Sequence, residues 1–122
     1  MTGPDGTIRT VYASDEFNQF FYDADKRVQS KLKFVIDVIQ RVYEIPTKYV
    51  KKLVEYNLYE MRISVGYNEY RTILFAVDHE NIIQSTKVIL LNSFLKKSNK
   101  DYKAQIRIAE QIIKSMEYDT NR

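Results

Sequence analysis

The stretch from LYEMRIS (58–64) through EYRTILFAVD (69–78) to QSTKVILLNSFLKKS (84–98) contains three consecutive runs typical of β-strands. The turn signals GYN (66–68) and DHEN (78–81) separate the runs, which predicts antiparallel hairpins with short loops. The last run is almost continuously apolar from residue 88 to residue 95, so it suits a central strand covered on both faces. This stretch therefore predicts a β-meander whose last strand lies inside the sheet.

Side chains of a strand alternate between its two faces, so the first run separates a polar face from an apolar one. The polar face carries Glu60, Arg62 and Ser64. A surface ion pair between Glu60 and Arg62 is one interpretation, and a basic binding surface is the other. Arg71 alternates with apolar residues, so it needs a partner or a position at the rim of the sheet. Its spacing leaves anion binding and an internal salt bridge open.

The segments around the meander predict one more strand and three helices. Residues 7–13 (TIRTVYA) alternate and read as a short first strand. Apolar residues at three- and four-residue spacing from Phe17 to Ile39 predict one long amphipathic helix. Pro46 can open a second, shorter helix that ends near Tyr56. A C-terminal helix follows, capped by Asn99 or Asp101, with an apolar stripe formed by Ile106, Ala109, Ile112, Ile113 and Met116.

This order predicts an α+β fold: an antiparallel-rich sheet of about four strands, two N-terminal helices packed on it, and a C-terminal helix. With 122 residues, 44% of them hydrophobic, the chain fits one domain over residues 1–122, in which residues 1–6 form a flexible tail. The absence of Cys excludes disulfides and thiolate chemistry. No long apolar run or signal-peptide pattern occurs, so we expect a cytoplasmic protein without a membrane partner.

Several common kinds of site are excluded by residue content. The one histidine, His79, falls in a turn, so neither a His-centred triad nor a His-rich metal site is available. The three glycines do not form a phosphate-binding loop, and the carboxylates lack the spacing of metal ligands. We therefore expect no metal and no cofactor.

Positive charge is concentrated near the C-terminal end of the meander. The net charge of +3 is modest, but residues 87–107 carry six positive charges against one negative charge. Candidate RNA-binding residues there are Lys96, Lys100, Tyr102 and Lys103, the tyrosine by stacking on a base. Solvated lysines and a tyrosine that packs at the helix start are the structural alternatives.

Such a surface can cleave RNA without a metal, because RNA carries its own nucleophile, the 2′-hydroxyl. Fixed positive charges stabilise the phosphorane-like transition state. Lys or Glu can act as the base when its pKa is tuned, whereas Arg, which is always charged, serves only as an electrostatic stabiliser.

The segments IPTKYVKKL (45–53), LYEMRIS, EYRTILFAVD and VILLNSFLKKS (88–98), followed by a helix, resemble the RelE/ParE superfamily of toxins. The likeness is greatest to its HigB-like, phage-associated branch and covers about residues 8–118. It implies a small α+β fold and a cytoplasmic toxin that cleaves mRNA in the ribosomal A site. It also implies a cognate antitoxin, expected to be of the helix-turn-helix type, which holds the toxin inactive.

The resemblance also suggests which residues carry the activity. Arg62 and Arg71 match strand arginines that bind RNA and stabilise the cleaved phosphate, and Lys96 and Lys97 match basic residues that close the last strand. Glu60 stands where some members have Lys, and Tyr102 is a loose counterpart of a C-terminal tyrosine near the active site. The candidate catalytic set is Glu60, Arg62, Arg71 and Lys97.

The sequence therefore predicts a ribosome-dependent mRNA endoribonuclease of a type II toxin–antitoxin system. Two alternatives remain open. One is a ParE-like, non-enzymatic inhibitor of DNA gyrase, and the other is a degenerate toxin that only binds its antitoxin.

Overall fold

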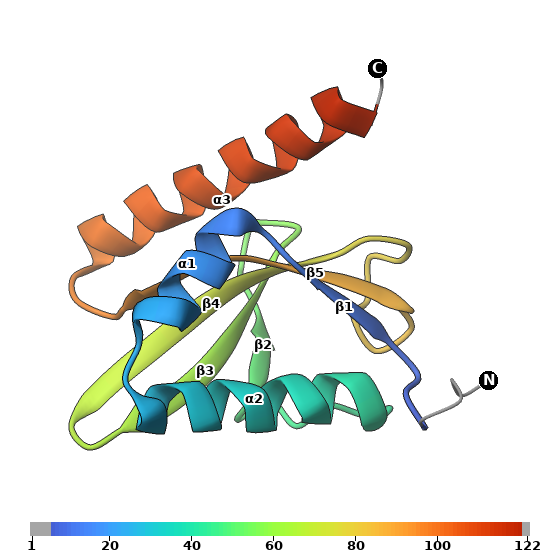
Figure 1. The fold of residues 1–122 in the computed structure, drawn as a ribbon. Helices are drawn as coiled ribbons and strands as arrows, with labels where there is room; N and C mark the ends of the chain where they lie inside the picture. Colours follow the sequence, from blue (N-terminus) through green and yellow to red (C-terminus); the bar gives the residue numbers. More distant parts are fainter. Residues whose placement is uncertain (1–5, 121–122) are drawn as a thin grey trace.

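A five-stranded mixed sheet forms the centre of the protein, and the computed structural model describes residues 6–120 (Figure 1). The elements in chain order are β1 (Thr10–Ala13), α1 (Asp15–Asp23), α2 (Lys26–Arg41), β2 (Val50–Lys52), β3 (Tyr59–Val65), β4 (Asn68–Ala76), β5 (Lys87–Leu95) and α3 (Asn99–Thr120). None of the helices within residues 6–120 is long and apolar enough to cross a membrane. The predicted α+β class is confirmed, with five strands in place of about four. Except for Gly6, the expected tail lies outside the described residues.

The strand order is β1-β5-β4-β3-β2, in which β1 runs parallel to β5 and the other neighbours are antiparallel. The predicted meander is confirmed as β3, β4 and β5. β5 lies between β1 and β4, so the prediction of a central last strand is also confirmed. A two-residue turn joins β3 to β4, and Gly66 adopts a φ of 61° there, a conformation that favours glycine.

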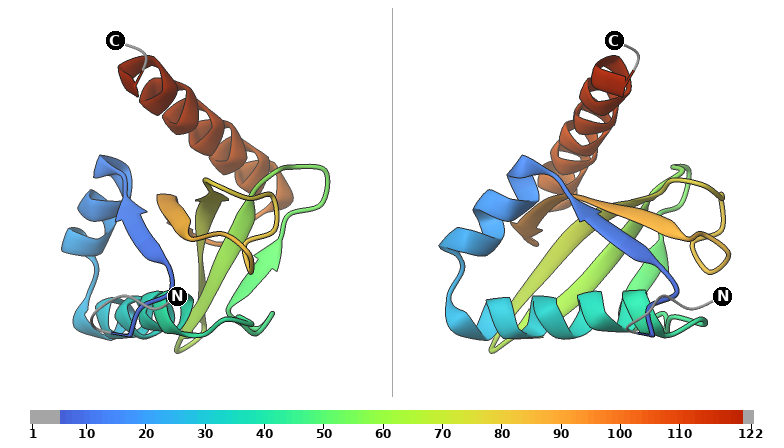
Figure 2. Two further views of the ribbon diagram at one scale, coloured as in Figure 1. Left: turned by 90° about the vertical axis from the view of Figure 1, so that its right-hand side faces the viewer. Right: turned by 45° about the vertical axis from the view of Figure 1, so that its right-hand side comes forward.

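Helices cover both faces of the sheet (Figure 2). On one face α2 packs against the apolar side of β3, which includes Met61 and Ile63, and α1 packs against β5. On the other face α3 packs against Ile73, Leu91 and Phe94. The polar face of β3 therefore lies on the α3 side of the sheet, and a helix borders it.

The single long helix predicted from Phe17 to Ile39 is wrong, because two helices occupy that segment. Ser14 caps α1 by accepting a hydrogen bond from the backbone N–H of Phe17, and its hydroxyl donates to a carbonyl of β5. Ala24 is extended, and Asp25 then caps α2 by accepting from the N–H of Val28 at 3.0 Å. The extended Ala24 thus ends the first helix, and the Asp25 carboxylate starts the next one within a continuous apolar pattern.

The short helix predicted from Pro46 to about Tyr56 is also wrong. Pro46 opens a turn, in which its carbonyl accepts hydrogen bonds from the N–H groups of Tyr49 and Val50. Residues 50–52 then pair with residues 59–61 as β2, the edge strand of the sheet. Glu55 has a φ of 74°, which is incompatible with a helix at this position.

The predicted C-terminal helix is confirmed as α3, and its stripe residues Ile106, Ala109 and Ile112 are buried. The predicted cap is wrong. Ser98 accepts a hydrogen bond from the N–H of Asp101, so Ser98 caps the helix and Asn99 is its first residue.

Arg9, just before β1, joins three segments that are distant in sequence. Its side chain is 2% exposed and belongs to none of the ion pairs among the described residues. The guanidinium instead donates hydrogen bonds of 2.6–3.1 Å to the carbonyls of Ile39, Val42, Tyr43, Ile82 and Ile83. These carbonyls belong to the end of α2, the residues after it and the β4–β5 loop. The buried side chain of Arg9 therefore anchors the start of β1 to the C-terminal end of α2 and to the β4–β5 loop.

Replacing Arg9 by Met should destabilise the fold strongly, because the substitution leaves buried carbonyls without donors. We expect a loss of at least about 3 kcal/mol in the free energy of unfolding, measured by urea denaturation. Arg27→Ala, at an exposed site on α2, is the control and should change stability by less than about 0.5 kcal/mol. Equal effects of the two substitutions would contradict the role assigned to Arg9.

Candidate functional site

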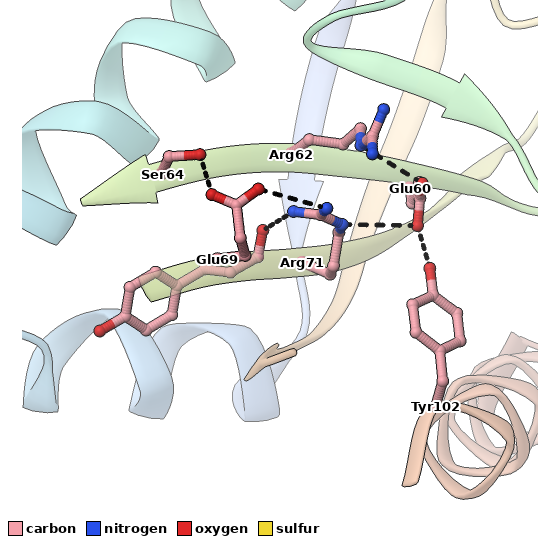
Figure 3. A network of polar contacts seen from close by, with 7 residues as sticks. Glu60, Arg62, Ser64, Glu69, Arg71 and Tyr102 are labelled. Atoms are coloured by element: carbon pink, nitrogen blue, oxygen red, sulfur yellow. Dashed lines mark hydrogen bonds and ion pairs between the residues drawn. The ribbon is translucent and has the colours of Figure 1, made fainter. Parts of the chain in front are cut away.

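The register of β3 and β4 places two arginines directly opposite each other. Arg62 pairs with Arg71, and Ser64 pairs with Glu69 one alternation further along. Opposed residues of an antiparallel pair lie on the same face, and like charges in such positions repel. The pair therefore requires carboxylates close by (Figure 3).

Glu60 supplies the central negative charge of this cluster. Its Oε1 lies 3.5 Å from Arg62 Nε, and its Oε2 lies 3.8 Å from Arg71 Nε. The hydroxyl of Tyr102 donates a hydrogen bond to Oε2 from the first turns of α3 (Figure 3). One carboxylate thus contacts two guanidinium groups and a phenol from three different elements.

Arg71 is enclosed by its partners. Its side chain is 2% exposed, and its Nη2 lies 3.6 Å from Oε1 of Glu69. Its Nη1 donates to the carbonyl of Tyr70 at 2.9 Å, while its Nε has no hydrogen-bond partner among the described residues. Of the two interpretations left open for Arg71, the structure contains the internal salt bridge.

Arg62 has the greater access to solvent. Its side chain is 34% exposed, and its ion pair with Glu60 corresponds to the surface pair that was one of the two interpretations. The cluster therefore presents one accessible guanidinium backed by one buried guanidinium.

Tyr102 is held both by packing and by its hydroxyl. Its ring stands edge-on to Phe94, with centroids 5.3 Å apart, and Phe94 is the β5 neighbour of Arg71. Burial, followed by the hydrogen bond to Glu60, raises the pKa of Tyr102 well above its ordinary value. The phenol thus stays protonated and remains a donor to the carboxylate at neutral pH.

Glu69 completes the cluster and was not among the residues singled out from the sequence. A hydrogen bond from Ser64 lowers the pKa of Glu69, and the nearby Arg71 and Arg62 lower it further. Strand alternation already places Glu69 and Arg71 on one face, so this ion pair could have been found from the sequence.

The candidate lysines lie beside this cluster and not within it. The N–H of Lys96 donates to the carbonyl of Glu69 at 2.8 Å, so the loop after β5 is fixed against β4. The side chains of four lysines are exposed and make no ion pair or side-chain hydrogen bond with other described residues: Lys96, Lys97, Lys100 and Lys103. The loop and the start of α3 therefore present unpaired positive charge.

His79 lies in the exposed β4–β5 loop, where its Nδ1 accepts a hydrogen bond from the N–H of Asn81. No group of three or more potential metal ligands occurs among residues 6–120.

Tyr102→Phe should abolish one late step in a spectrophotometric tyrosine titration. The raised pKa in the folded state means that the neutral phenol stabilises the fold below about pH 10, and that this contribution is lost as pH rises through the folded pKa. Wild-type protein should show one of its ten tyrosines ionising after the others, and the variant should lack that step. Identical titration curves would show that Tyr102 does not have this environment.

A comparison with curated protein sequences finds no match for this chain. A comparison with protein-family models finds that residues 19–114 match the family described as phage-derived protein Gp49-like (DUF891). The matched segment includes α2, the whole β3–β4–β5 meander and most of α3. It therefore contains every residue of the cluster around Glu60, and the resemblance to RelE-type toxins is confirmed at this level. The chain belongs to the Gp49-like family, a RelE-like toxin family of toxin–antitoxin systems.

Proposed function

We propose that this protein is the toxin of a type II system and cleaves mRNA on the translating ribosome, as a HigB-like endoribonuclease of the cytoplasm. Family membership supports a toxin, and one observation supports cleavage. That observation is the Glu60 carboxylate held between Arg62, Arg71 and the Tyr102 hydroxyl. A carboxylate with adjacent fixed positive charge is the pair of functions that metal-independent RNA cleavage requires.

In the proposed reaction the 2′-oxygen of RNA attacks the adjacent phosphorus, and the bond from phosphorus to the 5′-oxygen breaks. Glu60 accepts the proton of the 2′-hydroxyl. Lys97, an exposed ammonium in the loop after β5, gives a proton to the leaving 5′-oxygen. The products are a 2′,3′-cyclic phosphate and a 5′-hydroxyl, so atoms and charge balance without water or metal.

The two arginines have different tasks in this proposal. Arg62 is accessible and contacts the phosphate directly, where it stabilises the charge that develops in the transition state. Arg71 is enclosed, so it acts by orienting Glu60 and by adding its positive charge from within the sheet. The resemblance implies that Arg71 binds the phosphate directly. In this proposal Arg71 acts on the phosphate only through Glu60 and through its positive charge.

Binding of the RNA strand falls to the exposed residues beside the cluster. Lys96, Lys100 and Lys103 hold phosphates, and Tyr102, a partly buried member of the cluster, borders the bound nucleotide. The small number of contacts explains why we expect the ribosome to position the substrate. A cognate antitoxin of the helix-turn-helix type is the proposed protein partner, since the family implies an antitoxin.

The test of the function is a cell-free translation reaction in which new mRNA 5′ ends are mapped. Wild-type protein should produce cuts on translated mRNA and none on ribosome-free RNA. Glu60→Gln keeps the shape and the acceptor for Tyr102 but removes the base, so cleavage should fall at least about a hundredfold. Circular dichroism shows whether the variant is folded.

The absence of cuts with folded wild-type protein would overturn the nuclease. A supercoiling assay with DNA gyrase then separates a ParE-like inhibitor, which blocks supercoiling, from a degenerate toxin, which does not.

Arg62→Ala should lower the cleavage rate by about a hundredfold, the usual cost of losing one preorganised group that stabilises transition-state charge. Because Arg62 is partly exposed, the fold should be largely retained. Lys114→Ala, at an exposed site on α3, removes the same charge and should leave the rate unchanged. A similar loss in both variants would indicate that only overall charge matters and would contradict the role of Arg62.

A further inference from the structure

The edge of β3 is open beyond the end of β2. β2 pairs with residues 59–61 of β3, and the next hydrogen bond runs from the N–H of Arg62 to the carbonyl of Tyr49 at 2.8 Å. The chain before Tyr49 turns away at Pro46, whose carbonyl accepts from Tyr49 N–H. Among the described strands, none pairs with the outer edge of β3 from Arg62 to Val65.

The register shows which backbone groups point outward. A two-residue turn joins Val65 to Asn68, so these two residues form the hydrogen-bonded pair that closes the hairpin. Along β3 the direction alternates, and the groups of Ser64 and Arg62 therefore point away from β4. The bond from Arg62 N–H to Tyr49 agrees with this alternation. The open edge thus offers the N–H and C=O of Ser64 and the C=O of Arg62.

A groove with an apolar floor runs between this edge and α2. It has a volume of about 640 Å³, and its apolar lining includes Phe34, Val35, Tyr49 and Ile63. Phe34 is 57% exposed, and its ring stands edge-on to that of Tyr49 with centroids 5.8 Å apart. The exposed ring of Phe34, packed on the partly buried Tyr49 beside an open strand edge, provides an anchor for an apolar side chain.

The groove is positively charged. Lys31, Lys48 and Arg62 line it, and a second hollow with Lys26 and Arg27 continues it along α2 toward Gly66. Among the described residues that line the two hollows, the one carboxylate is Glu69. Glu69 is paired with Arg71, and Arg62 is paired with Glu60, so the positive charge of the groove comes from the lysines.

We propose that this edge is a docking site for an extended, acidic segment of a partner protein, which adds a strand to β3 alongside α2. Strand addition satisfies the outward backbone groups, while alternate side chains reach the apolar floor and the lysines. A peptide fits better than a nucleic acid strand, because the edge presents backbone donors and acceptors at strand spacing together with the exposed ring of Phe34. The proposal is independent of RNA cleavage, since its test measures binding alone.

The probe is a random library of peptides of about ten residues displayed on phage, selected on the wild-type protein. We expect enriched peptides in which acidic and β-branched or aromatic residues alternate. One enriched peptide is then synthesised with a fluorescent label, and its affinity is measured by anisotropy. A library without enrichment, or enrichment of basic or helical sequences, would overturn the proposal.

Two variants of one residue separate the backbone from the side chain. Ser64→Pro removes the outward N–H and also removes the hydroxyl bound to Glu69. A strand edge tolerates proline, because the missing N–H has no partner within the sheet. Ser64→Ala removes the hydroxyl alone and is the matched control. The labelled peptide should bind Ser64→Pro at least about tenfold more weakly than Ser64→Ala. The peptide loses a main-chain hydrogen bond, and the proline ring keeps its backbone from approaching the edge closely. Equal affinities would contradict strand addition.

If Ser64→Pro fails to fold, the main-chain hydrogen bonds can be tested by modifying the peptide instead of the protein. Methylating the backbone nitrogens that face β3 should abolish binding to the wild-type protein, while methylating the alternate nitrogens should not. Lys31→Glu combined with Lys48→Glu should weaken binding, and Lys114→Glu should not. A single-stranded RNA that displaces the peptide and binds Ser64→Pro and Ser64→Ala equally well would show a nucleic acid site and overturn the proposal.

Discussion

The pairing of β3 with β4 sets Arg62 directly opposite Arg71, and the organisation of the site depends on how these two positive charges are compensated. Two guanidinium groups facing each other on one sheet face are unfavourable unless carboxylates lie between or beside them. Glu60 lies between them and Glu69 beside them. The register therefore dictates a charge network, and every other feature of the site is arranged around it.

The network also ties the site to the packing of α3. Tyr102 contributes its ring to the contact with Phe94 and its hydroxyl to Glu60, so the same residue belongs to the apolar layer and to the polar cluster. A movement of the first turns of α3 would break the hydrogen bond and expose the carboxylate. The position of this helix thus controls how many groups the carboxylate contacts, which links the stability of the fold to the chemistry proposed for the site.

Much of this arrangement follows from local sequence rules, and the rest depends on partners distant in the chain. Strand alternation correctly placed Glu60 with Arg62, and the apolar run 88–95 correctly predicted a central strand. The spacing of Arg71 left an anion site and an internal pair open, although strand alternation already places its partner Glu69 on the same face. The hydrogen bond from Tyr102 to Glu60 could not be predicted, because Tyr102 comes from a helix far along the chain. Arg9 was not singled out, since its partners are backbone carbonyls that leave no pattern in the sequence.

The errors in the helices have a similar physical origin. Apolar periodicity continues from α1 into α2, so it does not reveal the break that Asp25 creates by capping the second helix. The residues after Pro46 have a weak helical pattern, but a short helix there would be only marginally stable. Pairing with the edge of β3 is more favourable, so residues 50–52 form a strand. In the first place the cap made by Asp25, and in the second place the pairing of β2 with β3, overrides the helical preference of the segment.

The proposed cleavage site and the proposed docking site lie on different parts of β3. The face of β3 carries the charge network, whereas its edge carries the open backbone groups, and Arg62 and Ser64 belong to both. A strand added to the edge would contact the side chain of Arg62 in the groove and the backbone of Ser64, whose hydroxyl holds Glu69 beside Arg71. Occupation of the edge would therefore restrict the accessible guanidinium without entering the buried part of the network. A partner bound there would inhibit the site through Arg62 and leave the pairing of Glu60 with Arg71 intact.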